Sequence, residues 1–345
     1  MSTIKDVALR AGVSVTTVSH VVNGTRHVSA AGRERVEQAI RELAYVPSAV
    51  ARSLKSNTTR TLGMLIPNSS NPYFAEIVRV VEDRCFAAGY TLILCNTDDE
   101  PRRQGIYLKV LAERRIDGLV VVSTGDDDSL PTLLASLRIP IVLLDREITE
   151  QDCDLVETAH MQGGLLATRH LVSLGHRRIA CIGGPAGLVP SEQRIAGWRL
   201  GLAEAGLDID ANPLFWHGGF TSQGGYEAMH AMLRTEPLPT AVFVCNDLMA
   251  IGALRAAHES GIQVPGALSI VGFDDIELSS FTSPPLTTVA QPKQRMGALA
   301  VAMLLERIEG RRRDTRKVVL QPELRVRAST GRHAGFVEPV RLLHV

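Results

Sequence analysis

Polar and aromatic side chains recur directly after apolar segments along residues 61–330, and their chemistry suits a small polyhydroxylated ligand. Aromatic rings can cover the apolar C–H faces of a sugar, while carboxylate, guanidinium and amide groups pair with hydroxyls, which both donate and accept. The candidate ligand contacts are Asn71, Tyr73, Phe74, Asp145, Arg146, Arg194, Phe220, Asn246, Asp274 and Gln291. At each position a bland alternative stays open, because polar residues after strands also cap the next helix. We expect Asp247 to cap the helix from Leu248 in this way.

The elements that must position these side chains are apolar strands that alternate with amphipathic helices. Strands are predicted at 61–67, 90–97, 118–123, 141–145, 178–182, 241–245 and 269–272. Helices are predicted at 74–88, 102–115, 162–174, 193–205, 224–233 and 248–260. Strands that are apolar on both faces and separated by helices predict parallel sheets in a doubly wound α/β fold.

About 270 residues of this pattern exceed what one sheet usually takes, so we expect two lobes. The chain should cross between them near His160, near Gln291 and Pro292, and near Gln321 and Pro322. In such folds a ligand lies at the carboxyl ends of the strands. The candidate ligand contacts should therefore meet in the cleft between the lobes.

A compact all-α head is predicted for residues 1–46. Helical spacing begins at Ile4, and Gly12 interrupts it where a tight turn needs a positive φ. Ser14 can cap a second helix, and Ser29 a third. This pattern predicts a helix-turn-helix, whose second helix enters the DNA major groove near its N-terminus. The predicted DNA contacts of the head are Val15, Thr16, Thr17, His20 and Arg26. By sequence alone, a plain three-helix bundle stays open.

Residues 47–60 are expected to join the head to the body. Pro47 and Ser48 start a helix of about two turns, which is too short to persist alone in water. Leu54 can wedge between base steps in a minor groove while Lys55 meets a phosphate. Ser48, Leu54 and Lys55 complete the predicted DNA contacts, although the same stretch could be a simple linker.

Charge is distributed unevenly along the 345 residues, although the net charge is zero. Residues 1–60 hold nine Lys or Arg against four acidic residues, which favours a nucleic-acid-binding head on an acidic body. Neither a membrane span nor a signal-peptide core is evident, so we expect a cytoplasmic protein. The five cysteines are far apart in apolar segments, which indicates buried thiols and no disulfides or zinc site.

Enzyme motifs are not found. The glycines after Cys181 lack the G-x-G-x-x-G spacing, and Pro185 removes a phosphate-binding N–H. No P-loop, helical metal-ligand pair or nucleophile elbow is present. We expect neither enzymatic activity nor a cofactor. A sugar-transport protein is disfavoured because it would need a signal peptide and no basic head.

Residues 3–56 resemble the DNA-binding head and hinge of the lac/gal repressor family, nearly residue for residue, and most closely its ribose and purine repressors. Residues 61–330 resemble the effector domain of that family and also the periplasmic ribose-binding proteins. The segments that carry this resemblance include Asn71-Pro72-Tyr73-Phe74, Leu144-Asp145-Arg146, Cys245-Asn246-Asp247 and Gly272-Phe273-Asp274.

The resemblance implies a homodimeric repressor on double-stranded operator DNA, with D-ribose or a related pentose as effector. Asp145-Arg146 is the reason for preferring a pentose, whereas Tyr73, Phe74 and Asp274 are shared with purine-responsive relatives. Sugar-responsive relatives are released from DNA by their ligand, and a purine-responsive repressor with a corepressor is the alternative. Residues 331–345 are a tail in which Pro339 breaks any helix, so no coiled coil is expected.

Overall fold

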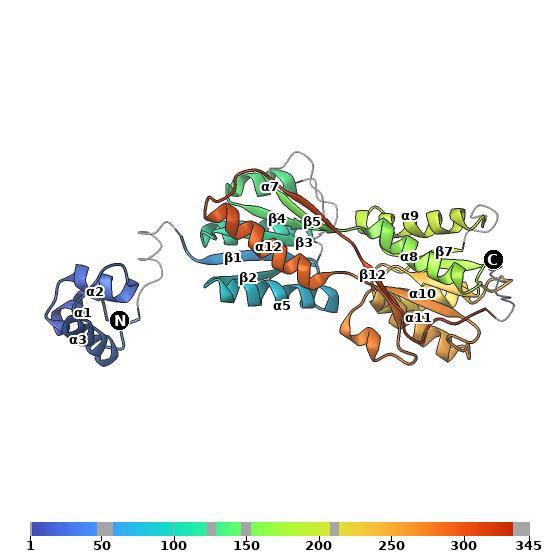
Figure 1. The fold of residues 1–345 in the computed structure, drawn as a ribbon, viewed down its shortest axis with the longest axis horizontal. Coiled ribbons are helices and arrows are strands. Elements are labelled where there is room, and N and C mark those ends of the chain that lie inside the picture. The colour runs from blue at the N-terminus through green and yellow to red at the C-terminus, as the bar shows by residue number, and fades with distance from the viewer. Residues whose placement is uncertain are drawn as a thin grey trace, which may run out of the picture. The chain divides into compact units, whose positions relative to one another are not determined.

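The computed structural model describes residues 2–46, 58–98, 100–122, 129–145, 153–207 and 214–333. The chain divides into two compact units, Met1–Thr59 and Arg60–Val345. Figure 1 shows the fold of the chain. The described residues form one hydrophobic core cluster in the first unit and three in the second. The predicted hinge residues Ser48, Leu54 and Lys55 lie outside the described residues, as does Arg146.

The head consists of α1 (Ile4–Ala11), α2 (Val15–Asn23) and α3 (Ala30–Glu42). Gly12 ends α1 with a φ of 62°, so the tight turn takes the left-handed conformation predicted for it. The hydroxyls of Ser14 and Ser29 accept hydrogen bonds from N–H groups in the first turns of α2 and α3. Val7, Val18 and Val36 are buried where the three helices meet.

Lobe 1 of the body comprises residues 60–159 and 292–320. Its six strands are β1 (Thr61–Ile66), β2 (Thr91–Asn96), β3 (Gly118–Val122), β4 (Ile141–Leu144), β5 (Asp154–Thr158) and β11 (Lys317–Leu320). They form a fully parallel sheet in the order β11-β5-β4-β3-β1-β2. The helices α5 (Pro72–Ala87) and α12 (Lys293–Ile308) share one core, and α6 (Pro101–Glu113) and α7 (Leu130–Leu137) share the other.

Lobe 2 comprises residues 160–291 and 321–333. Its strands are β6 (Ile179–Gly183), β7 (Phe215–His217), β8 (Ala241–Val244), β9 (Ser269–Asp274), β10 (Thr287–Ala290) and β12 (Glu323–Arg325). The order is β12-β10-β9-β8-β6-β7, and all pairs are parallel except β10 with β12. In Figure 1, α8 (His160–Ser173) and α9 (Val189–Glu204) lie on one side of this sheet, with α10 (Ser222–Met232) and α11 (Asp247–Glu259) on the other.

The chain crosses between the lobes after β5, after β10 and between β11 and β12. These are the three crossings expected near His160, Gln291 and Gln321, so each lobe is built from discontinuous chain. The prediction of α/β sheets is confirmed, but the predicted strands did not include β5, β7, β10, β11 and β12. The missed strands are mostly short or rich in Thr and charged residues, so their hydrophobic pattern is weak.

Four of the five cysteines are buried and all five are free thiols, while Cys153 is half-buried. Among the described helices, none is long and apolar enough to cross a membrane.

Candidate functional site

A cavity of about 430 Å³ lies in the body where the carboxyl ends of strands from both lobes meet. That volume is typical of small-molecule sites, which span about 300–1,000 Å³. Lobe 1 contributes the start of α5 and the residue after β4. Lobe 2 contributes α9, the end of β9 and the turns before α10 and α11. The lining residues include Asn68, Asn71, Tyr73, Phe74, Asp145, Leu188, Pro190, Arg194, Phe220, Asn246 and Asp274.

On the lobe 1 side, polar groups converge on the buried Asp145 carboxylate. The Tyr73 hydroxyl donates to Asp145 Oδ2 at 2.8 Å, and the Thr158 N–H donates to Oδ1 at 2.8 Å. His160 Nε2 lies 3.2 Å from the same Oδ1. His160 Nδ1 accepts from Arg194 Nε at 3.3 Å, so the His160 ring lies between Arg194 and the Asp145 carboxylate.

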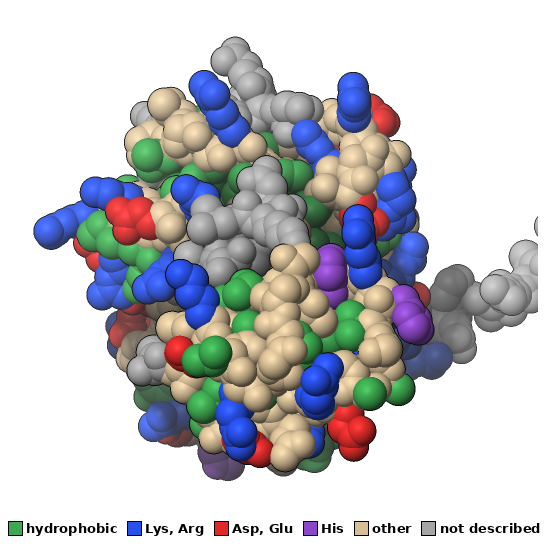
Figure 2. All heavy atoms as spheres, turned by 90° about the vertical axis from the view of Figure 1, so that its left-hand side faces the viewer, with side chains coloured by type: hydrophobic (Ala, Val, Ile, Leu, Met, Phe, Trp, Pro, Cys, Tyr) green, Lys and Arg blue, Asp and Glu red, His purple; other side chains and the backbone are tan. Residues whose placement is uncertain are grey.

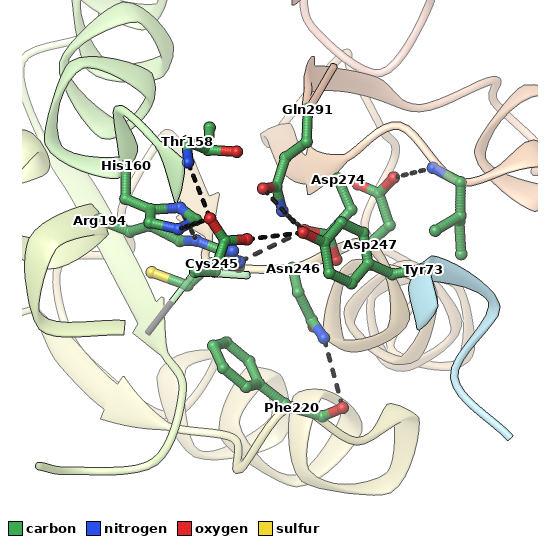
Figure 3. A network of polar contacts seen from close by, with 12 residues as sticks. Tyr73, Thr158, His160, Arg194, Phe220, Cys245, Asn246, Asp247, Asp274 and Gln291 are labelled. Atoms are coloured by element: carbon green, nitrogen blue, oxygen red, sulfur yellow. Dashed lines mark hydrogen bonds and ion pairs between the residues drawn. The ribbon is translucent and has the colours of Figure 1, made fainter. Parts of the chain in front are cut away.

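On the lobe 2 side, Arg194 and Asp274 form the centre of the site (Figure 3). Arg194 Nη1 donates to the Cys245 carbonyl at 2.6 Å and lies 3.4 Å from Asp274 Oδ1, which also accepts from Gln291 Nε2 at 2.7 Å. The guanidinium stacks on Phe273 at 3.9 Å from the ring centroid. The two halves are joined, since Gln291 Oε1 lies 3.1 Å from the Tyr73 hydroxyl.

The two carboxylates differ electrostatically. Burial acts to raise the pKa of Asp145, but His160, Thr158 and Tyr73 outweigh it, and the pKa lies below its usual value. Burial raises the pKa of Asp274 above its usual value, although Arg194 and Gln291 oppose the shift. Asp145 is therefore the more firmly ionised acceptor. Burial, followed by the charges of Asp145 and Asp274, raises the pKa of Tyr73, which stays a hydroxyl donor.

Three residues of the cavity have backbone conformations that L-amino acids rarely adopt. The φ angles of Asp145, Phe220 and Asp274 are 53°, 59° and 117°. Such strain costs about 1–3 kcal/mol per residue and tends to cluster at functional sites. The Phe220 ring also packs on Gly184, where a Cβ would lie 2.3 Å from the ring. These features support a binding role for the cavity.

Of the ten predicted ligand contacts, eight line this one cavity: Asn71, Tyr73, Phe74, Asp145, Arg194, Phe220, Asn246 and Asp274. Gln291 lies behind them and holds Tyr73 and Asp274. The sequence reasoning missed Asn68, the wall around Leu188 and Pro190, and the supporting His160. His160 was noted only as a crossing point, and nothing local in the sequence marks its link between Asp145 and Arg194.

The expectation that Asp247 caps α11 is wrong. Asn246 is the cap, because its Oδ1 accepts from the Met249 N–H at 2.9 Å. The Asp247 carboxylate is fully buried and accepts from the Ile276 N–H and the Thr288 hydroxyl at 2.9 and 2.6 Å. Burial and the charge of Asp274 raise its pKa well above the usual value. Asp247 thus ties α11 to the loop that follows β9.

The candidate DNA contacts of the head lie around α2. Val15, Thr16 and Arg26 are exposed, and Val15 keeps 41% of its surface accessible. The Thr17 hydroxyl lies 2.9 Å from the Ser14 hydroxyl, and His20 Nδ1 lies 2.8 Å from the Thr25 hydroxyl. Thr17 is therefore engaged at the helix cap, whereas Thr16 is exposed. Figure 2, which shows the left-hand side of Figure 1, has more Lys and Arg than Asp and Glu side chains in view.

Comparisons with known proteins agree with this arrangement. Residues 3–48 match the family model of bacterial regulatory proteins, lacI family, and residues 168–330 match that of the periplasmic binding protein-like domain. The chain is 44% identical to the HTH-type transcriptional repressor PurR of Mannheimia succiniciproducens, over 95% of this chain and 98% of that protein.

Two solved structures are also similar. The lac repressor dimer bound to operator and the anti-inducer ONPF has a TM-score of 0.86 at 32% identity, covering 96% of this chain and 99% of that one. A LacI family regulator from Enterococcus faecium with bound ribose has a TM-score of 0.72 at 31% identity, covering 79% and 99%. The relatives named PurR do not support the preference for a ribose repressor. This chain therefore belongs to the lacI family of DNA-binding transcriptional repressors.

Proposed function

We propose that the effector of this repressor is a five-carbon sugar, D-ribose or a close derivative, bound between the two lobes. The observation that carries this proposal is the pairing of buried carboxylates, an arginine and two amides with aromatic side chains around one cavity. Asp145 and Asp274 offer acceptors from opposite lobes, and a sugar has hydroxyl donors on both sides of its ring. A ligand that hydrogen-bonds to both carboxylates favours the closed arrangement of the lobes.

The internal hydrogen bonds of the cavity mimic those that a sugar would make. Asp145 already accepts from one hydroxyl, that of Tyr73, and Asp274 accepts from an amide and lies beside a guanidinium. The half-buried Phe74 and Phe220 rings supply apolar surface for C–H groups. A carboxylate has about four lone-pair sites, so Asp145 and Asp274 can each accept further hydrogen bonds, which favours a ligand rich in hydroxyl groups over one with few donors.

A purine corepressor is the second candidate, and the curated relatives named PurR favour it. A purine would stack on the aromatic rings. Leu188 and Pro190, which line one wall of the cavity, offer a purine no side-chain donor or acceptor. A LacI family regulator from Enterococcus faecium that is 31% identical to this chain has bound ribose, which gives the first candidate a precedent among the relatives.

Calorimetry on the purified protein distinguishes the two candidates. D-ribose should bind, while hypoxanthine and guanine should not. Asp274→Ala should abolish sugar binding because it removes a buried acceptor, and operator binding should survive. The matched control is Asp83→Ala, since Asp83 is an exposed carboxylate on α5. Tight purine binding without sugar binding would establish the second candidate instead.

Sugar binding is proposed to release the operator, and the repressor to act as a cytoplasmic homodimer. For a coupling of about 1–3 kcal/mol, saturating D-ribose should raise the operator dissociation constant about 5- to 150-fold. Anisotropy titration of labelled operator at fixed salt measures this ratio, and tighter binding with sugar would indicate corepression.

Phe86 and Phe281 are 79% and 77% exposed, as expected of apolar side chains that a second copy covers.

A further inference from the structure

The end of β9 and the turn that follows it hold two consecutive aspartates with positive φ angles. Asp274 has a φ of 117° and Asp275 a φ of 52°. Neither residue is a glycine, so the surroundings must hold this backbone in place. The conformation matters because it directs the Asp274 carboxylate toward the cavity and the Asp275 carboxylate toward Arg327, with Asp275 Oδ1 and Arg327 Nη2 2.6 Å apart.

The buried ammonium of Lys293 holds this turn by hydrogen bonds to its main chain. Its Nζ donates to the carbonyl oxygens of Asp274 and Asp275 at 2.8 and 2.5 Å. Its third contact is with Glu76 Oε2 at 2.9 Å, so these three acceptors match the three protons of the ammonium. Only 8% of the Lys293 surface is accessible. Burying a charged side chain often contributes little net stability, even when the charge is paired. The contacts of Lys293 with two main-chain carbonyls therefore indicate that it positions the Asp274 turn.

These contacts of Lys293 also join the two lobes. Lys293 begins α12, which packs with α5 in the core of lobe 1, whereas Asp274 and Asp275 belong to lobe 2. Glu76 lies on α5, one turn after Tyr73, and its Oε1 accepts from the Glu277 N–H of lobe 2 at 3.0 Å. The helix that begins with the cavity residues Tyr73 and Phe74 is thus connected to the turn that carries Asp274.

We propose that Lys293 is a positioning residue for the effector, and that the Glu76–Lys293 pair transmits effector binding at Asp274 to α5 of lobe 1. This inference rests on the proposed function, since it assigns a role around the same cavity. Lys293 is not among the described residues that line the cavity, and it acts through the main chain of Asp274 and Asp275. Glu76 then carries the link between the lobes without supporting the carboxylate itself.

The proposal predicts that the two residues have separable effects. Lys293→Met should weaken D-ribose binding about tenfold or more, because the turn loses two charge-assisted hydrogen bonds. Lys293→Arg, which keeps the charge and several donors, should recover part of the affinity. Glu76→Gln should keep D-ribose affinity within about threefold but reduce the ratio of operator dissociation constants with and without saturating sugar. Lys109→Met on the exposed face of α6 is the matched control.

A purely structural role would lower thermal stability and leave the operator ratio at saturating sugar unchanged, which would overturn the proposal. Hydrogen–deuterium exchange of residues 274–280 tests, without any effector, whether Lys293 holds the turn in place. Lys293→Met should speed exchange of the Ile276 and Glu277 amides at least about tenfold relative to Lys109→Met, since those amides are held by Asp247 and Glu76. Unchanged exchange would refute the positioning role, whereas a parent protein that binds no sugar refutes only the proposed effector. In that case the same binding and operator titrations are carried out with hypoxanthine in place of D-ribose.

Discussion

Replacing Gly197 by alanine should push α8 and α9 apart and displace Arg194. The two helices touch along their backbones here, and a Cβ on Gly197 would lie 2.1 Å from the Met161 carbonyl oxygen and 2.7 Å from the Leu165 nitrogen. Ordinary contact begins at 3.4 Å, so the clash with the carbonyl requires a shift of about 1.3 Å, the difference between 3.4 and 2.1 Å. Both obstructing atoms belong to the main chain, so no side-chain rotation relieves the clash.

The magnitude follows from two opposing terms. Overpacking typically costs about 1–3 kcal/mol, and alanine in a helix interior recovers about 1 kcal/mol relative to glycine. We expect a net loss of about 0–2 kcal/mol and a fall in Tm of up to about 8 °C. Arg194 is three residues before Gly197 and should move with it, which breaks its 2.6 Å hydrogen bond to the Cys245 carbonyl. Effector affinity should fall about 10- to 100-fold.

Thermal unfolding and calorimetry with the effector measure both consequences. The control is Gly105→Ala in α6, because the nearest atom to its new Cβ is Leu133 Cδ1 at an ordinary 3.8 Å. This variant should be slightly more stable than the parent and bind the effector equally well. A Gly197→Ala protein that matched Gly105→Ala in Tm and the parent in affinity would refute the reasoning.

Three further outcomes are expected. Leu54→Ala should weaken specific operator binding in a gel-shift titration without altering effector binding, because the minor-groove wedge is lost; equal operator affinity would count against it. Phe281→Glu should shift the protein toward monomers in light scattering, because Phe281 is 77% exposed and apolar, and an unchanged mass would argue against this interface. Stability should fall as pH drops below about 6.5, because burial lowers the pKa of His176 and the unfolded chain then binds the proton more readily. His176→Gln should flatten that pH dependence of Tm, and an equally steep profile would exclude His176 as its source.

Much of the molecule follows from local sequence pattern. The capping serines Ser14 and Ser29, the turn at Gly12 and the valines at helical spacing determine the head, because each acts within a few residues of chain. Apolar runs separated by amphipathic helices determine the α/β body in the same local way. Parallel sheets then bring the strand ends to one edge, which is why Asp145, Asn246 and Asp274 could be predicted to meet.

Other features were decided only by tertiary structure, because they join residues far apart in the chain. His160 connects Asp145 to Arg194. Lys293 contacts both the Asp274 carbonyl and the Glu76 carboxylate. The sequence around each of these residues carries no signal of that role. The left-handed backbone of Asp274 likewise needs surroundings that no local propensity specifies, since an isolated chain would relax it. Local sequence pattern determines which polar side chains lie at the strand ends, whereas long-range packing determines their pKa values and their contacts with one another.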